Sequence, residues 1–403
     1  MNIRYRSMVD NGIYYSLCGM MISNILSSIF TRHLFTLMAV LVIIRLAVWK
    51  FSGLRTNLNR QSIILAGLLM LLAGSIFIAA INGGHWFDVT FGGGNIFSHT
   101  VWGAVLILVV GKFIDTQKRL YTLLTLAITG LVINDIFVYK QHYDEMSRAI
   151  GFYWNPNVLA SILTVPVPIL FVGIMKFWRN VPYRIVLSVI FIMTVLALLF
   201  TQSRGAWLAV FGAIILLLPA TRANYRKPLL KLLLCGIVAV ILAVPMTNNL
   251  NRLSSIGDMQ EQTHTERILT MKAGWEMFLD HPIFGVGVDN WGKEYHTKYI
   301  SAEAKEPHLT TSHNNIIQIL SECGLVGFIA YAAVITYILA WAWRRRENLA
   351  SVAIIGMTVV VLLHGMVDCI YFMWPTMRWY WMFLAVLMQL TNLDKTIGRE
   401  DLE

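Results

Sequence analysis

Long apolar runs, separated by short polar connections, cover nearly the whole chain. Each run of roughly 17 to 25 residues is long enough to cross about 30 Å of hydrocarbon as a helix. This pattern predicts an all-α polytopic membrane protein with about 12 membrane-spanning helices. The expected spans are 12–30, 33–50, 62–81, 97–114, 120–139, 157–176, 183–201, 204–220, 230–248, 313–340, 349–366 and 375–392.

Composition agrees with this pattern, because 57% of the residues are hydrophobic and only 13% are charged. Such a chain is too apolar for an ordinary soluble domain. The first apolar run has no small-residue cleavage site at its end, so we expect a retained span rather than a removed signal peptide. The four cysteines, which show no disulfide or metal-ligand spacing, are expected to be free thiols: Cys18, Cys235, Cys323 and Cys369.

Lysine and arginine fall in every second connection, which predicts the orientation in the membrane. Because basic connections stay in the cytoplasm, both termini are expected to be cytoplasmic. The net charge of +10 is therefore mainly a topology signal, and no nucleic-acid partner is expected. The basic positions are Arg4 and Arg6; Lys50, Arg55 and Arg60; Lys112, Lys118 and Arg119; Lys176, Arg179 and Arg184; Arg222, Arg226, Lys227 and Lys231; and Arg344, Arg345 and Arg346.

One long loop, residues 249–312, interrupts the short connections on the side opposite the basic ones, which is the periplasm in a bacterial inner membrane. Its segment "TERILTMKAGWEMFLDHP" places apolar residues at helical spacing and ends at Pro282. We expect an amphipathic helix lying along the membrane surface, with Ile268, Met271, Trp275 and Phe278 on its apolar face. Without repeats or a proline-rich linker, residues 1–403 are expected to form a single membrane domain that includes this loop.

Three arginines on the loop side could bind an anion. Arg204 lies between two apolar runs; it could snorkel at the interface, but a charge at such depth usually faces a cavity, which favours a phosphate clamp. Arg267, in the loop helix, could simply be solvated. Arg148 could serve function or pair with Asp144 or Glu145.

His313 stands where the loop meets the tenth apolar run. The spacing predicts a helix that begins at 313, with Ile317, Leu320, Gly324 and Gly327 on one face below the histidine. The glycines would let a neighbouring helix approach closely. A helix N-terminus disfavours imidazolium, so His313 could act as a general base. The alternative is an interfacial or capping histidine.

Asp368 lies beside His364 at the loop-side end of the eleventh run. An acid so close to hydrocarbon needs a partner. We expect Arg378 or one of the other arginines to pair with it, in a structural role rather than a catalytic one. Motifs of soluble catalysts, such as a phosphate-binding glycine loop, a zinc-type histidine pair or a nucleophile elbow, do not occur.

Four segments resemble motifs of one superfamily. "HNNIIQILSECGLVG", with His313, Asn314, Gly324 and Gly327, is similar to the signature of the bacterial O-antigen ligase family. "RILTMKAGWEMFLDHPIFGVGVDNW" looks like the loop segment shared by O-antigen ligases, O-antigen polymerases and related oligosaccharyltransferases. "RAIGFYWNPNVLA" and "TQSRGAWLA" are similar to two upstream motifs.

The resemblance implies a metal-independent, inverting glycosyltransferase of the GT-C membrane type that uses no cofactor. It would move O-antigen polysaccharide from undecaprenyl diphosphate to a sugar hydroxyl of the lipid A-core, on the periplasmic face of the inner membrane. Arg204 and Arg267 match the arginines that hold the donor diphosphate, and His313 matches the histidine that acts on the acceptor. Arg148, Asn314 and Asp368 would support them.

Three alternatives stay open at this point: an O-antigen polymerase, a related protein-directed oligosaccharyltransferase, and a transporter or flippase. An O-antigen polymerase uses similar donors, but one large loop before a His-Asn helix favours the ligase. A transporter or flippase would also have about 12 spans, with charged residues at midmembrane depth. Here only Arg45 interrupts a span near its middle.

Overall fold

A computed structural model of the 403-residue chain describes residues 3–50, 58–92, 95–221 and 262–400, with positions 227, 230 and 234 between the last two ranges. Regular secondary structure in these ranges is helical throughout. Apart from two of those positions, the expected span 230–248 lies outside the described residues, and so does the start of the long loop, 249–261.

Six helices form the first part of the chain: α1 (Ile3–Ser23), α2 (Ser28–Trp49), α3 (Arg60–Asn82), α4 (Trp86–Phe91), α5 (Ile96–Phe113) and α6 (Gln117–Tyr143). The expected first span, 12–30, is wrong, because a turn after Ser23 divides it. Ser27 starts the next helix by accepting a hydrogen bond from the Phe30 amide, as N-cap serines do.

The middle of the chain contains α7 (Pro156–Thr164), α8 (Pro166–Lys176), α9 (Val181–Phe200) and α10 (Arg204–Ala220). The expected span 157–176 is thus two helices, because Pro166 has no amide hydrogen to continue the helical hydrogen bonds.

The last part contains α13 (Gln262–Asp280), α14 (Trp291–Glu294), the π-helical turn η3 (Tyr295–Tyr299), α15 (Asn315–Trp343), α16 (Leu349–His364), the 3₁₀ turn η4 (Ile370–Phe372) and α17 (Trp374–Glu400). The helix expected in the long loop is confirmed as α13. Its predicted apolar positions Ile268 and Trp275 are largely exposed, while Leu269, Ala273 and Met277 are buried against the protein. The exposed side chains of Ile268 and Trp275 could contact a membrane surface, so that contact stays a prediction.

Seven helical stretches of the described residues are long and apolar enough to cross a membrane: Ser28–Trp49, Arg60–Asn82, Trp86–Phe113, Gln117–Tyr143, Pro156–Lys176, Val181–Phe200 and Asn315–Trp343. The helices α10 and α16 are apolar but shorter. The chain is therefore a polytopic membrane protein by its helices, whereas the expected number of about 12 spans stays a prediction.

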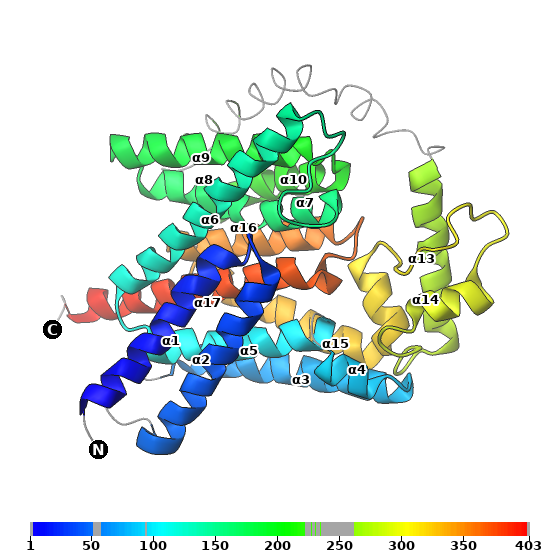
Figure 1. The fold of residues 1–403 in the computed structure, drawn as a ribbon, viewed down its shortest axis with the longest axis horizontal. Coiled ribbons are helices and arrows are strands. Elements are labelled where there is room, and N and C mark those ends of the chain that lie inside the picture. The colour runs from blue at the N-terminus through cyan, green and yellow to red at the C-terminus, as the bar shows by residue number, and fades with distance from the viewer. Residues whose placement is uncertain are drawn as a thin grey trace.

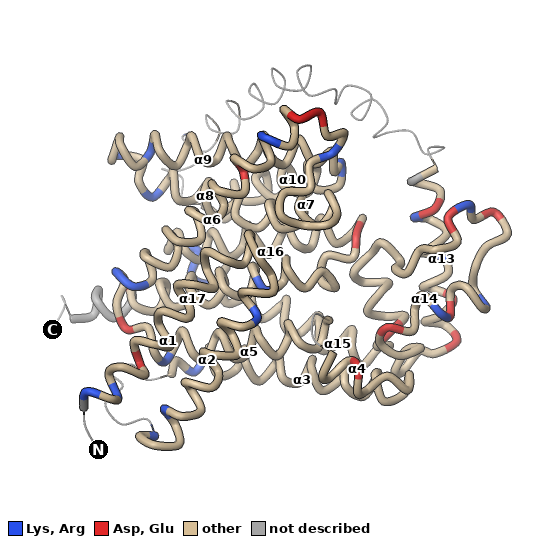
Figure 2. The backbone as a smooth tube through the Cα atoms, viewed as in Figure 1, with Lys and Arg blue, Asp and Glu red and all other residues tan. Residues whose placement is uncertain are grey.

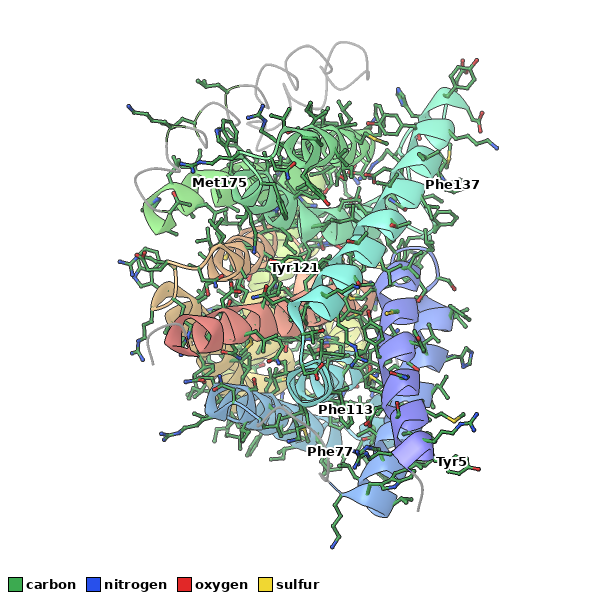
Figure 3. The ribbon with its side chains drawn as sticks, turned by 90° about the vertical axis from the view of Figure 1, so that its left-hand side faces the viewer. Tyr5, Phe77, Phe113, Tyr121, Phe137 and Met175 are labelled. Atoms are coloured by element: carbon green, nitrogen blue, oxygen red, sulfur yellow. The ribbon has the colours of Figure 1, made fainter. Side chains whose placement is uncertain are left out.

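Most of the long helices pack side by side, with α17 in the middle of the bundle against α5, α6 and α16 (Figure 1). Trp379, Tyr380 and Trp381 of α17 are almost fully buried there. The outer surface is apolar: Ile43 and Leu71 are each about two-thirds exposed, at 67% and 68%, and Tyr5 lies on the outer edge of the view in Figure 3. Such an exterior suits a lipid environment.

The two ends of the bundle differ. The end that carries both chain termini is rich in lysine and arginine, whereas α13 and α14, at the other end, carry both signs of charge (Figure 2). We call this other end the distal end; there the last residues of α1, α3, α6, α9 and α16 meet the first residues of α2, α5, α7, α10, α15 and α17. Hydrogen bonds link these segments: Asn24 to Pro375, Ala149 to Phe200, Asn82 to Gly285, and Asn315 to Gly365.

Candidate active site

His313 lies at the distal end, just before α15. The expectation that position 313 begins the helix is wrong: Asn314 is the N-cap, and its side-chain oxygen accepts hydrogen bonds from the amides of Ile316 and Ile317 at 2.9 and 3.2 Å. Asparagine is among the best N-cap residues. His313 instead takes a left-handed backbone conformation, with φ of 53°. Its side chain is therefore not part of the helical face below, and 21% of it is exposed.

Asp368 is the acidic neighbour of His313. Nδ1 of His313 lies 3.5 Å from Oδ1 of Asp368, whose side chain is 7% exposed. The distance is long for a hydrogen bond and suits an ion pair or a contact that tightens when substrate binds. The expected pairing of Asp368 with Arg378 is not formed between these described residues.

Two asparagines fix this pair in place. Nδ2 of Asn314 donates to the Met366 carbonyl at 3.1 Å, and the Asn315 amide donates to the Gly365 carbonyl at 2.7 Å. Oδ1 of Asn315 in turn accepts from the Tyr371 amide at 2.9 Å. The "HNN" sequence thus ties the start of α15 to the connection between α16 and η4, which carries Asp368.

The ionisation of Asp368 fits this environment. Burial raises the pKa of its carboxyl, but the contact with His313 and the electrostatic influence of nearby basic groups, Arg267 among them, outweigh burial and hold the pKa below its ordinary value. Asp368 is therefore a carboxylate at neutral pH, able to orient a neighbouring imidazole.

Arg267 reaches this pair from α13. Two helical turns along the same face of α13, a Cβ at Gly274 would lie 2.7 Å from Ile317 and 3.3 Å from Ser312, so α13 packs against the start of α15. Arg267 lies close enough to His364 and Asp368 for its charge to act on both. Its Nε is buried and has no hydrogen-bond partner among the described residues.

Arg204 approaches the same connection from α10. It is the first residue of that helix and is 9% exposed. A Cβ at the next residue, Gly205, would lie 2.6 Å from Val367 and 3.6 Å from His364. The start of α10 therefore packs directly against the segment that carries Asp368.

Arg148 links two neighbouring segments of the backbone. It donates to the Thr201 carbonyl at 2.9 Å and to Oδ1 of Asn157 at 2.7 Å, joining the end of α9 to the start of α7. The ion pair with Asp144 or Glu145 does not form between these described residues. Arg148 therefore shapes the turn that leads to Arg204.

The predicted role of Gly324 and Gly327 needs correction. Gly324 interrupts α15 with φ of 63°, so the two glycines do not continue one helical face. A Cβ at Gly324 would lie 2.3 Å from the Ile283 carbonyl oxygen, and one at Gly285 would lie 2.3 Å from the Glu322 carbonyl carbon. The close approach is therefore by the backbone of the loop after α13, not by another helix.

The loop after α13 forms hydrogen bonds with the backbone groups that the break in α15 leaves without helical partners. The amides of Val286 and Gly287 donate to Ser321 and Glu322, and the amides of Leu325 and Val326 donate to Pro282 and Ile283, at 2.8 to 3.3 Å. Broken helices are tolerated in membrane proteins where other protein groups satisfy their backbone. This junction fixes α13, and with it Arg267, relative to His313.

Sequence reasoning missed Gln318 and Glu322. Oε1 of Gln318 accepts from the Ser312 amide at 2.7 Å and so shapes the turn that carries His313. Glu322 is 3% exposed at the break in α15. Both are polar residues in an apolar run, one helical turn apart, which is the signal that could have identified them.

The arrangement brings Arg267, His313 and Asp368 together, and it packs the helix start that carries Arg204 against the segment that carries Asp368. An imidazole beside a carboxylate can take a proton from a hydroxyl, and guanidinium groups can bind phosphate oxygens. Across the described ranges, no group of three or more His, Cys, Asp or Glu side chains could hold a metal ion.

Comparison with known proteins agrees with the sequence motifs. No curated protein matches the chain. A family model described as O-antigen ligase matches residues 189–332, from within α9 to within α15, and so includes Arg204, Arg267 and His313. The match shows that these residues, 189–332, are similar to the O-antigen ligase family.

Proposed function

We propose that this protein is an O-antigen ligase. It would transfer O-antigen polysaccharide from undecaprenyl diphosphate to a sugar hydroxyl of the lipid A-core, and the membrane lipids around it would deliver both substrates. The observation that carries the proposal is the His313–Asp368 pair at 3.5 Å, beside the helix start of Arg204 and within electrostatic reach of Arg267.

The orientation follows from charge. Lysine and arginine gather at the end of the bundle that carries both termini (Figure 2), and positively charged connections are retained in the cytoplasm. With that end in the cytoplasm of a bacterial inner membrane, the distal end faces the periplasm. Donor and acceptor would both be presented on that side.

On the donor side, the leaving group is a lipid diphosphate, whose negative charge grows as the bond to the anomeric carbon breaks. Arg204 and Arg267 would bind its oxygens. A unit charge pair at 4 Å is worth about 4 kcal/mol at an effective dielectric near 20. Since about 1.4 kcal/mol corresponds to a tenfold rate change, one arginine can supply about two to three orders of magnitude. We assign this neutralisation to arginine rather than to a metal ion.

On the acceptor side, a core sugar hydroxyl would attack the anomeric carbon from the face opposite the diphosphate. The bond from carbon to the diphosphate oxygen breaks, the new glycosidic bond forms, and configuration inverts. His313 would take the hydroxyl proton, and the Asp368 carboxylate would orient its ring and stabilise the imidazolium. Asn314 and Arg148 would hold the two segments that carry these groups.

A cell experiment tests the proposal and separates it from an O-antigen polymerase. In a strain that lacks this gene, smooth lipopolysaccharide should disappear while undecaprenyl-linked O-antigen of normal length accumulates. If no long polymer formed at all, we would conclude that the protein is a polymerase rather than a ligase.

Variants expressed at normal level connect this phenotype to the site. Complementation with His313→Ala or Arg267→Ala should reproduce the null phenotype, whereas Asp280→Asn should restore smooth lipopolysaccharide, since Asp280 pairs with Lys298 on the exposed end of α13. Full complementation by either site variant would remove that residue from the mechanism.

A further inference from the structure

A second buried arginine, Arg378 on α17, lies at the distal end without an acidic partner. Its residue surface is 2% exposed, and its guanidinium carbon lies 4.0 Å from the Trp102 ring centre and 4.5 Å from that of Trp374. Among the described residues it forms no hydrogen bond or ion pair, and its Nε is buried without a partner. Tryptophan faces attract a cation but leave its hydrogen-bond donors unused.

The surroundings of Arg378 add positive and polar groups rather than negative charge. Arg32 of α2 is its cationic neighbour, and His99 in the first turn of α5 feels its charge. Both ring nitrogens of His99 are buried without a hydrogen-bond partner in the described part of the chain. Two cationic side chains beside a buried imidazole, with no carboxylate near them among the described residues, make a place that favours an anion.

The site is rigid. Nδ2 of Asn24 in the turn between α1 and α2 donates to the Pro375 carbonyl at 3.3 Å, and Thr376 bonds to Ser161 of α7 at 2.5 Å. Phe35 of α2 stacks on Trp102 at 3.7 Å, and Trp154 stacks on Trp374 at 6.0 Å. The guanidinium therefore contacts Trp102 of α5 and Trp374 of its own helix, and Phe35 and Trp154 hold these two rings in place.

The site also lies beside the lipid-facing surface. Helix α2, which supplies Arg32 and Phe35, packs mainly on α1 and exposes large apolar side chains along its length, among them Ile29, Phe30 and Leu37. Because this helix is apolar on its outer surface, an anionic group that approaches Arg378 along it would belong to a molecule that also has an apolar part. Arg267 acts on His364 and Asp368, whereas Arg378 acts on His99, so the two cationic groups have different neighbours.

We propose that Arg378, together with Arg32, binds the phosphate of a membrane lipid headgroup, with Trp102 and Trp374 covering the guanidinium faces. This site is separate from the one formed by Arg204 and Arg267. It goes beyond the proposed ligase function, because binding at Arg378 requires no transfer reaction. The phosphate could come from a phosphorylated glucosamine lipid such as lipid A, from a polyprenyl diphosphate, or from an anionic glycerophospholipid.

Lipid binding to the purified full-length protein tests this site. The protein would be placed in nanodiscs of zwitterionic phospholipid, and affinity measured separately for diphosphoryl lipid A, undecaprenyl diphosphate and phosphatidylglycerol. Arg378→Gln and Arg32→Gln should both weaken binding of the same one of these three lipids. The expected loss is about tenfold or more for each variant, because a charge-assisted hydrogen bond is lost. The lipid that loses affinity identifies the source of the phosphate.

A matched control is Arg184→Gln, since Arg184 also stacks on a tryptophan, Trp178, at 5.1 Å, in the basic connection before α9. It should leave all three affinities unchanged. If Arg378→Gln does not fold, the lipid affinities of Arg32→Gln test the site, because Arg32 is exposed and its replacement should not affect folding. Unchanged affinities for all three lipids in the folded variants would overturn the site. Because no glycosyl transfer is measured, that outcome would leave the proposed ligase reaction untouched.

Discussion

Buried arginine nitrogens at the two ends of the bundle differ in their partners. Arg45 near the end of α2 has a fully buried side chain, and its Nε donates to Oδ1 of Asp10 at 2.6 Å while Nη1 donates to the Lys50 carbonyl at 3.0 Å. Arg267 and Arg378 at the distal end have a buried Nε that no described residue satisfies.

The difference separates structural cations from binding cations. Removing a charge from water costs several kcal/mol unless a partner compensates for it. At the terminal end Asp10 of the chain itself compensates Arg45, so this arginine, the one that sequence placed near the middle of a span, is structural. At the distal end the Nε atoms of Arg267 and Arg378 lack a partner among the described residues, and in both proposals the phosphate of a ligand would compensate them.

The largest expected effect is that of His313→Ala, because it removes the proton acceptor. Loss of a general base lowers rates by about 10²- to 10⁴-fold. Transfer to a lipid A-core acceptor should fall by this factor at unchanged expression and thermal stability. A variant that retains more than about a tenth of wild-type transfer would indicate that His313 only borders the site.

Arg267→Ala should follow, with a loss of about 10²- to 10³-fold in transfer rate, from the Coulomb energy of one ion pair. Arg267→Lys keeps the charge but not the planar pair of donors, and should recover part of the activity. Steady-state kinetics with a soluble analogue of the donor would check this order. Equal rates for the alanine and lysine variants would show that charge is not what Arg267 contributes.

Asp368→Asn should have a moderate effect, about tenfold or more, and should change the pH profile. Because the pKa of this carboxyl is lowered, Asp368 is a carboxylate at neutral pH, and its negative charge stabilises a neighbouring cation. The variant lacks this charge at every pH, so the acid limb of its pH profile should move to lower pH. An unmoved limb would argue against contact between the two groups during catalysis.

Arg45→Met should show the opposite pattern. Breaking the pair with Asp10 should lower the thermal unfolding midpoint, since removal of one partner leaves the other uncompensated, while transfer by the folded protein should stay within about twofold of wild type. Thermal unfolding and transfer assays on one preparation would measure both. If a stable Arg45→Met protein lost transfer activity, the claim that Arg45 is structural and the distal arginines bind ligand would be wrong.

The smallest effect is expected for Lys298→Ala. Lys298 pairs with Asp280 at 2.8 Å, and both side chains are about half exposed. Exposed ion pairs of this kind contribute little to stability. Transfer rate and unfolding midpoint should equal those of wild type within error, which makes this variant the reference for the others.

The sequence predicts much of the fold, because hydrophobic run length reports helices directly. It places α2, α3, α5, α6, α9 and α10 within a few residues at most ends. It fails where a single residue decides a boundary: Ser27 starts α2, and Asn314 takes the N-cap position beside His313. These are competitions between neighbouring caps and breaks, which periodicity does not resolve.

The candidate site was predictable as a set of residues but not as a geometry. Orientation and motifs select Arg204, Arg267 and His313, whereas Asp368 is expected in a structural pair with an arginine. The pairing of Asp368 with His313 rather than Arg378 depends on how Asn314 and Asn315 bind the connection after α16, a contact across some 50 residues of sequence. The break at Gly324 likewise depends on a loop that supplies its hydrogen bonds from outside the helix.

The central claim is that the distal end joins a lipid-diphosphate-linked glycan to a lipid A-core. Purified protein in proteoliposomes, given undecaprenyl-diphosphate oligosaccharide and rough lipopolysaccharide, tests it most directly when the products are resolved by mass. We predict one glycan added to the lipopolysaccharide, with inverted anomeric configuration, and none with His313→Ala. Glycans joined to one another on the polyprenyl carrier, with the lipopolysaccharide unchanged, would contradict the account.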